Sequence, residues 1–526
     1  MEYQLKKYSL LLSLFLCLFV SCSSSNKLLT DNEYKLIDKE NIKLNLEFLA
    51  SDELEGRETS TRGEKLAALY IKTELQKYGV KPYFEDNSFL QTFNLDAGTI
   101  NPGSKITIKN EKNNKSSEFK VIDDFFASME TSKMKINENT PIIFAGYGIT
   151  APEFNYDNYT NLDVKGKIVV VIPGEPSSDD SKFFNGEEET RYSSTRTKSS
   201  IAKDHGALVV ISVADKNFEA RWDFIKRFFT RPSFHIIDSN NKSSDFLSVY
   251  VKSSVGKSLF SDQQYSLEDL MAKAEKGEPL NVFTLNAKIN FEIKKNEDIR
   301  QASNVIGVIP GNDPVLKNEY VAIGAHYDHL GIQNGKVFNG ADDDGSGTVT
   351  VMEVAKAFGI SHNNKRSILI AFHTGEEKGL LGSQYLTNNL DIIKDKRLIS
   401  QINIDMVGRE NTDSIYSIGS DKLSSEMKKI VEEANNETVK MVLNYKYDDP
   451  SDPNRFYYRS DHYNYAKHGI PIVFFFDDMR TDYHKDTDEV DKINFEKMKK
   501  IATLVYTVAD KIANLDHRLI VDKPIK

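Results

Sequence analysis

Apolar and polar residues follow three different patterns along the chain. Near the N-terminus, residues 10–20 form an apolar run that contains a single serine. Between residues 98 and 297 the apolar runs are short, β-rich and interrupted by turn residues, which indicates a mostly β unit. From Asn304 onward, longer apolar strands alternate with helical segments. The expected strands are 305–309, 320–324, 367–372, 398–406 and 471–476. Such alternation predicts an α/β domain with a largely parallel sheet.

The length of the chain favours more than one domain. A chain of 526 residues exceeds the size at which one hydrophobic core usually stops growing. Leu66, Leu69 and Leu75 recur at helical spacing, and Gly79 is a typical stop, so a helix precedes the β-rich stretch. We therefore predict an α/β domain built from residues 41–97 and 298–516 and interrupted by a β-rich insertion at 98–297. Residues 23–40 are expected to be a tether and residues 517–526 a tail.

The N-terminus has the features of an export signal. Lys6 and Lys7 precede the apolar run, which is too short to span a bilayer comfortably. The run ends in Ser21-Cys22 and resembles the lipobox of bacterial lipoproteins, although Phe19 stands where Leu is usual. We predict that residues 1–22 are a signal peptide and that an acylated Cys22 anchors an exported protein to a bacterial membrane, on its periplasmic or cell-surface side. An ordinary cleaved signal is the alternative.

Composition narrows the class of protein. Hydrophobic residues make up 39% of the chain and charged residues 28%, as in ordinary folded proteins. The formal net charge is −10, with no sustained run of Lys or Arg, and this argues against a nucleic-acid partner. The only cysteines are Cys17 and Cys22, so no internal disulfide is expected in the mature chain.

Five stretches place a carboxylate or an imidazole at the end of an expected strand or just after it. They contain His326 and Asp328, then the acidic run 342–344, then Glu376 and Glu377, then Asp405, and finally His484. Ligands of open α/β sheets gather at the carboxyl ends of the strands. We therefore expect these side chains to share one edge of the sheet.

These residue types suit a hydrolytic metal site. An Asp two residues after a His in an extended run can orient a metal-bound imidazole, as Asp328 would for His326. Three consecutive acids need compensation that a dication supplies, although acids are also favoured at helix starts. Of two adjacent glutamates, one can bind metal while the other acts as a general base. Alone, the acidic turn and His484 are more typical of a solvated surface.

In this order, the stretches resemble the di-zinc metallopeptidase family that contains bacterial leucyl aminopeptidases, aminopeptidase Y and glutamate carboxypeptidases. Residues 49–57 (Leu-Ala-Ser-Asp-Glu-Leu-Glu-Gly-Arg) and the helix after Gly63 resemble the family's N-terminal portion. Residues 144–149, 156–159, 164–171 and 203–211 resemble the protease-associated domain that several members carry as an insertion. The resemblance implies a zinc-peptidase fold of the phosphorylase/hydrolase-like type.

The resemblance also implies the site. Two Zn²⁺ ions are expected, with Asp343 bridging them, His326 and Asp405 completing one site, and Glu377 and His484 the other. Glu376 would be the general acid/base, and Asp328 would orient His326. Asp461 and Tyr483 are candidates for a supporting shell. His329 and His373 could line the cleft, whereas His205, His235, His362 and His517 are expected to be structural.

The expected function is removal of N-terminal residues from peptides. A carboxypeptidase or dipeptidase on the same scaffold stays open, because Arg455, Arg459 and Arg480 could pair with a substrate carboxylate. A glutaminyl cyclase is a third relative, but the full two-metal ligand set favours hydrolysis. A peptide- or glycan-binding lipoprotein without catalysis gives no reason to keep Glu376 beside a complete ligand set.

Overall fold

The computed structural model describes residues 36–524, apart from 111–114, 130–133, 135, 181, 187–188, 238–245, 262, 410, 450–451 and 480. The signal peptide, Cys22 and the first part of the tether lie outside the described residues, so export and lipid attachment stay predictions. Within the described part of the chain, no helix combines the length and the apolar character needed to cross a membrane.

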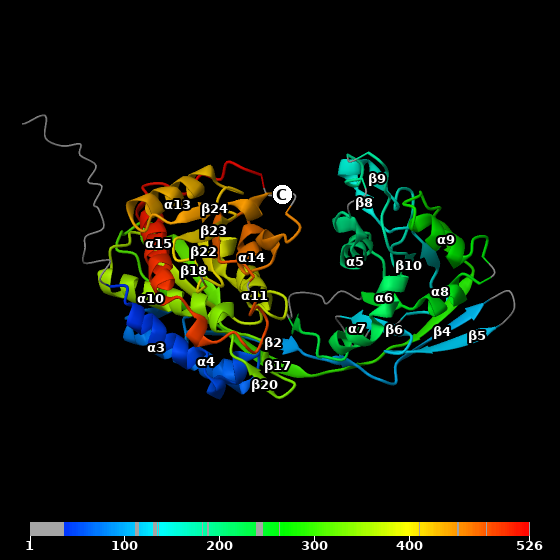
Figure 1. Cartoon of the computed structure of the whole chain (residues 1–526), viewed down its shortest axis with the longest axis horizontal. Helices are drawn as coiled ribbons and strands as arrows, with labels where there is room; N and C mark the ends of the chain where they lie inside the picture. Colours follow the sequence, from blue (N-terminus) through cyan, green and yellow to red (C-terminus); the bar gives the residue numbers. More distant parts are fainter. Residues whose placement is uncertain are drawn as a thin grey trace, which may run out of the picture.

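A ten-stranded mixed sheet forms the centre of the α/β domain (Figure 1). Its order is β12-β2-β17-β21-β18-β22-β25-β23-β24, with β1 beside β17. The four central strands, β21, β18, β22 and β25, are parallel to one another, as expected. On one side of them, the pairings β21–β17, β17–β2 and β2–β12 are antiparallel. On the other side, β23 is antiparallel to β25. The bounds are β1 Lys81–Pro82, β2 Leu90–Asp96, β12 His235–Ile237, β17 Ile299–Ile309, β18 Tyr320–His326, β21 Ser367–His373, β22 Leu398–Ile404, β23 Ser414–Ile418, β24 Val442–Asn444 and β25 Ile472–Phe476.

Helices cover both faces of this sheet. One face packs against α3 (Lys39–Leu49), α4 (Arg62–Lys77), α10 (Gly347–Ser361), α13 (Ser425–Glu437) and α15 (Phe495–Asn514). The other face packs against α11 (Leu381–Asn389), α12 (Asp391–Lys394) and α14 (His462–Ala466). The central strands are buried on both sides, which explains their continuous apolar sequence.

Helix α15 illustrates how the sequence pattern produces this packing. Asn494 accepts a hydrogen bond from the backbone N–H of Lys497 and so caps the first turn. Met498, Ile501, Val505 and Ile512 recur at helical spacing and are fully buried against the sheet and α10. Residues 515–524 follow this helix and are mostly exposed, apart from the buried Leu519.

The insertion has a hydrophobic core of its own and more helix than its sequence suggested. A six-stranded sheet of order β14-β7-β10-β11-β13-β6 packs with a three-stranded sheet of order β15-β4-β5. Figure 1 shows this part in cyan to green, beside the α/β domain. In the described part of the insertion, five α-helices accompany the strands, so the unit is mixed rather than purely β. That it is a protease-associated domain, and the domain boundaries themselves, stay predictions.

The strands of the insertion are β3 Thr99–Ile100, β4 Lys105–Asn110, β5 Ser116–Lys120, β6 Phe125–Met129, β7 Ile142–Phe144, β8 Thr150–Ala151, β9 Tyr156–Asp157, β10 Ile168–Val171, β11 Val209–Val213, β13 Leu247–Val251, β14 Phe283–Leu285, β15 Ala287–Glu292 and β16 Lys295–Asn296. Its helices are α5 Thr195–Asp204, α6 Lys216–Ala220, α7 Trp222–Phe229, α8 Ser253–Leu259 and α9 Leu267–Ala274.

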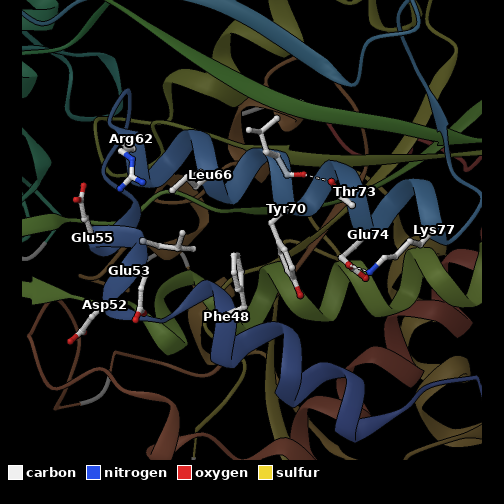
Figure 2. A pocket seen from close by; sticks show the side chains of 12 residues that line it. Phe48, Asp52, Glu53, Glu55, Arg62, Leu66, Tyr70, Thr73, Glu74 and Lys77 are labelled. Carbon is white, nitrogen blue, oxygen red and sulfur yellow. Dashed lines mark hydrogen bonds and ion pairs between the residues drawn. The ribbon is translucent and has the colours of Figure 1, made fainter.

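A surface groove runs between α3 and α4 (Figure 2). Phe48 and Tyr70 stack along it with ring centroids 4.1 Å apart. Asp52, Glu53 and Glu55 stand at one end. None of the carboxylates and imidazoles singled out in the sequence lines this groove, so it is separate from the site described next.

Candidate metal centre

The five stretches that contain the candidate site residues lie at one edge of the sheet, at the ends of its parallel strands. His326 is the last residue of β18, Asp405 directly follows β22, and Glu376 follows β21 by three residues. His484 comes from the loop after β25. The structure therefore brings together all of the candidate ligands at the carboxyl ends of the strands, where open α/β sheets bind their ligands.

The first group of ligands surrounds the Nε2 atom of His326. This nitrogen lies 3.3 Å from Asp343 Oδ1 and 3.6 Å from Asp405 Oδ1. The three side chains are buried and their ligand atoms converge on one point. On the other side of the ring, Nδ1 lies 3.1 Å from the backbone carbonyl oxygen of Asp328 and 3.7 Å from its carboxylate. The backbone of Asp328 thus contributes more directly to the ring orientation than its carboxylate does.

The second group shares Asp343 with the first. His484 Nε2 lies 3.2 Å from Asp343 Oδ2 and 3.2 Å from Glu377 Oε2. Although burial favours the neutral acid, hydrogen bonds with His326 and His484 hold the pKa of Asp343 well below its usual value. One ionised carboxylate with an oxygen toward each group is the geometry that a bridging ligand requires.

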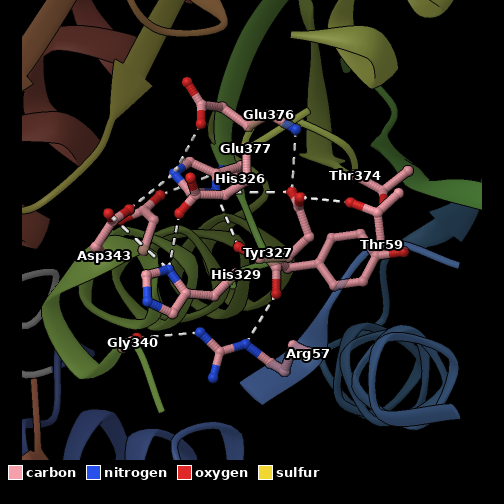
Figure 3. A network of polar contacts seen from close by, with 12 residues as sticks. Arg57, Thr59, His326, Tyr327, His329, Gly340, Asp343, Thr374, Glu376 and Glu377 are labelled. Carbon is pink, nitrogen blue, oxygen red and sulfur yellow. Dashed lines mark hydrogen bonds and ion pairs between the residues drawn. The ribbon is translucent and has the colours of Figure 1, made fainter. Parts of the chain in front are cut away.

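His329 joins the second group, which sequence reasoning did not anticipate. Its Nδ1 lies 2.8 Å from Glu377 Oε1 and 3.9 Å from Asp343 Oδ2, and the side chain is fully buried (Figure 3). His329, Asp343 and Glu377 form a cluster able to hold a metal ion. The only hint in the sequence was that His329 directly follows Asp328, which had been expected to lie at the site. His373, in contrast, lies beside His326 in the sheet and contacts the hydroxyl group of Tyr465 at 3.1 Å.

The three consecutive acids have three different environments. Asp342 accepts a hydrogen bond from the backbone N–H of Gly408 and lies 3.3 Å from the guanidinium of Arg409. Asp343 alone faces the imidazoles. Asp344 accepts hydrogen bonds from three backbone N–H groups, those of His326, Gly347 and Met406. Asp344 therefore caps the start of α10, as the alternative for acids at a helix start suggested. Only Asp343 is placed to be a metal ligand.

Glu376 stands over the first group of ligands. Its Oε2 lies 3.9 Å from His326 Nε2, and its backbone N–H donates to Asp328 Oδ1 at 3.1 Å. The hydroxyl group of Thr59 donates to the other oxygen of Asp328 at 2.8 Å. Burial raises the pKa of Glu376 well above its usual value, and the negative charges of Glu377 and Asp405 act in the same direction. A carboxyl group whose pKa is raised from its usual value binds a proton more strongly, which suits a group that accepts and later releases one.

Ser460 supports one of the ligands from just before α14. The Ser460 hydroxyl donates to Asp405 Oδ2 at 2.7 Å and accepts from Asn403 at 2.9 Å, so it fixes the orientation of that ligand. Asp461 is fully buried, and burial raises its pKa to about 7. Tyr483 stacks on His484 with ring centroids 3.8 Å apart. Sequence reasoning identified Asp461 and Tyr483 as supporting candidates but did not assign a contact to Ser460.

The side chains present fit a divalent metal. Both ring nitrogens of His329 and Glu377 Oε1 are buried without a hydrogen-bond partner, because the 2.8 Å contact between them lacks hydrogen-bond geometry. Four acids crowd the same space and need positive charge to coexist: Asp343 and Asp405, which are buried, and Glu376 and Glu377, which are partly buried. Imidazole and carboxylate donors, with open space beside them, are the set that catalytic zinc prefers.

Arg57 ties together the segments that carry the ligands. Its side chain is 1% exposed and donates to the backbone carbonyl oxygens of Tyr327 at 2.8 Å, Asn339 at 2.6 Å and Gly340 at 3.0 Å, and also to that of Leu49 (Figure 3). Tyr327 stands between His326 and Asp328, and Gly340 precedes the acidic run. One guanidinium therefore satisfies four buried acceptors on three different segments.

Replacement of Arg57 by methionine is expected to destabilise the protein by roughly 3 kcal/mol or more, because four buried carbonyl groups lose their donor. The free energy of unfolding, measured by denaturant titration, checks this value. Arg62→Met is the matched control, since Arg62 is exposed and five residues away. Equal stability of the two variants would contradict the assigned role of Arg57.

Buried Glu64 adds a pH-dependent term to stability. Burial raises its pKa from 4.5 to about 7, although hydrogen bonds from Thr374 and Tyr327, both 2.8 Å, oppose the shift. Between these two pH values the folded chain binds more protons at Glu64 than the unfolded chain does, so stability falls as pH rises through this window. Glu64→Gln should match the parent near pH 4.5 and exceed its free energy of unfolding by about 3 kcal/mol at pH 8. A difference independent of pH, in denaturant titrations at both values, would disprove this account.

The fold and the site together define a class of protein. A buried carboxylate–imidazole cluster at the carboxyl ends of a parallel sheet, with a poised glutamate beside it, is the arrangement of a metal-dependent hydrolase. Residues 304–509 match the model of Peptidase family M28. The match of this part of the chain to a peptidase family agrees with the hydrolase class that the site defines.

Similar proteins agree with this assignment. The chain is 26% identical over 291 residues to a "Probable leucine aminopeptidase" of Arthroderma otae, covering 53% of this chain and 73% of that protein. It is 30% identical over 190 residues to a "Probable leucine aminopeptidase 2" of Aspergillus fumigatus, covering 35% of this chain and only 34% of that protein. The solved aminopeptidase from Aneurinibacillus sp. strain AM-1 has a TM-score of 0.53 at 19% identity, over 94% of this chain and 98% of that one. That structural likeness extends across the insertion and shows the fold.

Proposed function

We propose that the protein is a zinc-dependent aminopeptidase that holds two zinc ions. The observation that carries the proposal is the position of Asp343, which offers one carboxylate oxygen to His326 at 3.3 Å and the other to His484 at 3.2 Å. His326, Asp343 and Asp405 would hold one ion, and Asp343, Glu377 and His484 the other. His329 is placed to assist the second group through Glu377. The names of the two fungal relatives support the aminopeptidase assignment.

The protein's own groups divide the work of hydrolysis. When bound, the zinc ions would act as Lewis acids on the scissile carbonyl and lower the pKa of water. Glu376 would accept the proton of the attacking water and later deliver it to the leaving amine. Asp328 holds the backbone of Glu376 in place, since its carboxylate accepts that N–H at 3.1 Å. The buried acids of the site would attract the ammonium group of a peptide N-terminus.

A pocket beside the ligands supports recognition of an apolar first residue. Its lining combines His326, Asp343, Glu376, Asp405 and His484 with a set of apolar side chains. These are Met406, Phe456, Phe474, Phe476, Met479 and Tyr483. Aromatic and thioether side chains next to the reacting groups favour an apolar first residue over a charged one.

A carboxypeptidase or dipeptidase is the second candidate, because Arg459 also lines this pocket. Its guanidinium stacks on Phe456 at 5.0 Å and lies 3.7 Å from the sulfur of Met479. Arg455 instead stacks on Tyr458 at 4.6 Å and is exposed, and Arg480 lies outside the described residues. Arg459 is thus the cation best placed to bind a substrate carboxylate.

Hydrolysis of paired substrates separates the two candidates. The protein lacking residues 1–22 would be given free and N-acetylated aminoacyl and dipeptide substrates, with and without a chelator and zinc add-back. We expect chelator-sensitive cleavage that requires a free amine. Cleavage of N-blocked peptides that end in a free carboxylate would favour the carboxypeptidase instead. Cleavage that survives exhaustive chelation would reject the zinc-dependent proposal.

A further inference from the structure

Helix α7 of the insertion has an outer face that the fold does not use. On its inner face, Trp222 stacks on Phe126 with centroids 4.1 Å apart, and Phe229 stacks on the same ring at 4.5 Å. On its outer face, Phe224 and Phe228 are 53% and 57% exposed, and their rings lie 5.4 Å apart. Since the inner face accounts for the packing of the helix, the exposed aromatic pair needs another explanation.

Two arginines cover these exposed rings. The guanidinium carbon of Arg227 lies 4.6 Å from the centroid of Phe224, and that of Arg231 lies 6.0 Å from the centroid of Phe228. Among the described residues, no carboxylate forms an ion pair with either guanidinium. We call these four residues the Arg/Phe strip. In a chain of net charge −10, the strip is a local cationic and aromatic surface that favours an anionic occupant.

The C-terminal end of the strip contacts the loops that follow His329 and Glu377, two residues of the second group of ligands. Arg231 donates to the side-chain oxygen of Gln333 at 3.4 Å, four residues after His329. Three residues after Arg231, the ring of Phe234 lies 5.4 Å from the ammonium group of Lys378, which directly follows Glu377. The next residues form β12, which pairs with β2 and so extends the catalytic sheet. The strip therefore continues from the rim of the candidate metal centre into the insertion.

We propose that the Arg/Phe strip binds an anionic segment of the peptide substrate on the C-terminal side of the cleaved bond. The inference rests on the proposed peptidase function and specifies its substrate class, namely peptides that carry acidic residues several positions after the N-terminus. Guanidinium groups stacked on aromatic rings pair with carboxylates, and the exposed rings contact the peptide's apolar atoms. An extended chain covers about 3.3–3.6 Å per residue, so a substrate of roughly six residues spans about 20 Å of this surface.

An anionic lipid surface shares this chemistry, but the attachments of the strip favour the substrate. Arg231 and Phe234 connect the end of α7 to the loops of His329 and Glu377. A peptide whose first residue occupies the pocket has to leave it along the rim of the site. A surface that bound only lipid would have no need of continuity with these loops.

The test compares three hexapeptides that begin Leu-Gly-Gly-Gly and end in two Glu, two Gln or two Lys residues. The enzyme is the mature chain loaded with zinc, in low salt, and kcat and KM are measured separately. Leucine p-nitroanilide, which ends before the strip, is the reference substrate.

The strip variants are Arg227→Gln with Arg231→Gln, and Phe224→Ala with Phe228→Ala. The matched control, Lys216→Gln with Lys257→Gln, removes two exposed cations elsewhere in the insertion.

We expect the Glu-ended peptide to have a KM about fivefold lower than the Gln-ended one in the parent and control, and the arginine variant to abolish this difference. Turnover of leucine p-nitroanilide should stay within about twofold in every variant, because the strip lies outside its reach. An unchanged preference in the arginine variant would overturn the proposal.

Binding of a fluorescent Gly-Gly-Gly-Glu-Glu peptide, followed by anisotropy, gives a readout that needs no catalysis. If the protein cleaves nothing, the proposed function fails, while loss of peptide binding in the arginine variant still supports the strip. Binding to phosphatidylglycerol vesicles that depends on the strip, without preference for the acidic peptide, would replace the substrate proposal with a membrane one. An equal affinity of parent and variant for the fluorescent peptide would overturn the strip itself.

Discussion

Replacement of Glu376 by glutamine is expected to lower kcat by roughly a thousandfold while leaving the zinc content unchanged. Glutamine has nearly the same shape, and Glu376 is outside both proposed ligand groups, so the metal ligands should keep their positions. What is lost is the group that accepts a proton, since an amide oxygen cannot do so at neutral pH. The measurement is steady-state hydrolysis of leucine p-nitroanilide together with metal analysis of the same sample.

A nearby glutamate supplies the control for this substitution. Glu58 pairs with Lys378 at 2.8 Å, close to the same loop, but it does not line the pocket. Glu58→Gln should therefore keep kcat within a few-fold of the parent. Activity of the Glu376 variant equal to that of the Glu58 variant would show that Glu376 is not the general base. Loss of zinc from the Glu376 variant would instead indicate that it is a ligand.

Replacement of Asp343 by alanine is expected to remove zinc from both proposed sites and to abolish activity. Its two carboxylate oxygens face the two ligand groups, so a single substitution removes a ligand from each of them. Asp405→Ala is the matched comparison, because Asp405 belongs to the first group alone. Metal analysis should give close to one zinc ion per chain for the Asp405 variant and much less than one for the Asp343 variant.

Thermal unfolding provides a second readout of the same prediction. A metal that binds only the folded chain raises its melting temperature, and the rise grows with the logarithm of the metal concentration relative to Kd. Zinc should therefore raise the melting temperature of the parent and of Asp405→Ala, but not that of Asp343→Ala. If the Asp343 variant retained one tightly bound ion, Asp343 would be a ligand of one site rather than a bridge between two.

The sequence by itself determined the architecture of the α/β domain and the chemical identity of the site. Buried parallel strands need continuous apolar runs, and these runs are visible without any tertiary contact. Each strand that leads into the site also ends beside its polar residue, as β18 does at His326 and β22 does before Asp405. Since parallel strands present their carboxyl ends at one edge, sequence position alone predicted that these residues would meet.

Only the tertiary structure decided the contacts that depend on approach between distant segments. The role of each acid in the run 342–344 depends on the group that contacts it. Asp342 pairs with Arg409, Asp343 faces the imidazoles, and Asp344 accepts hydrogen bonds from backbone N–H groups. Likewise, His329 reaches Glu377, and Ser460 reaches Asp405 across 55 residues. The helices of the insertion escaped sequence reasoning because short amphipathic segments such as α7 resemble strands in composition. The local sequence pattern shows which face of a helix or strand is apolar. The partner of a polar side chain, in contrast, depends on how the whole chain packs.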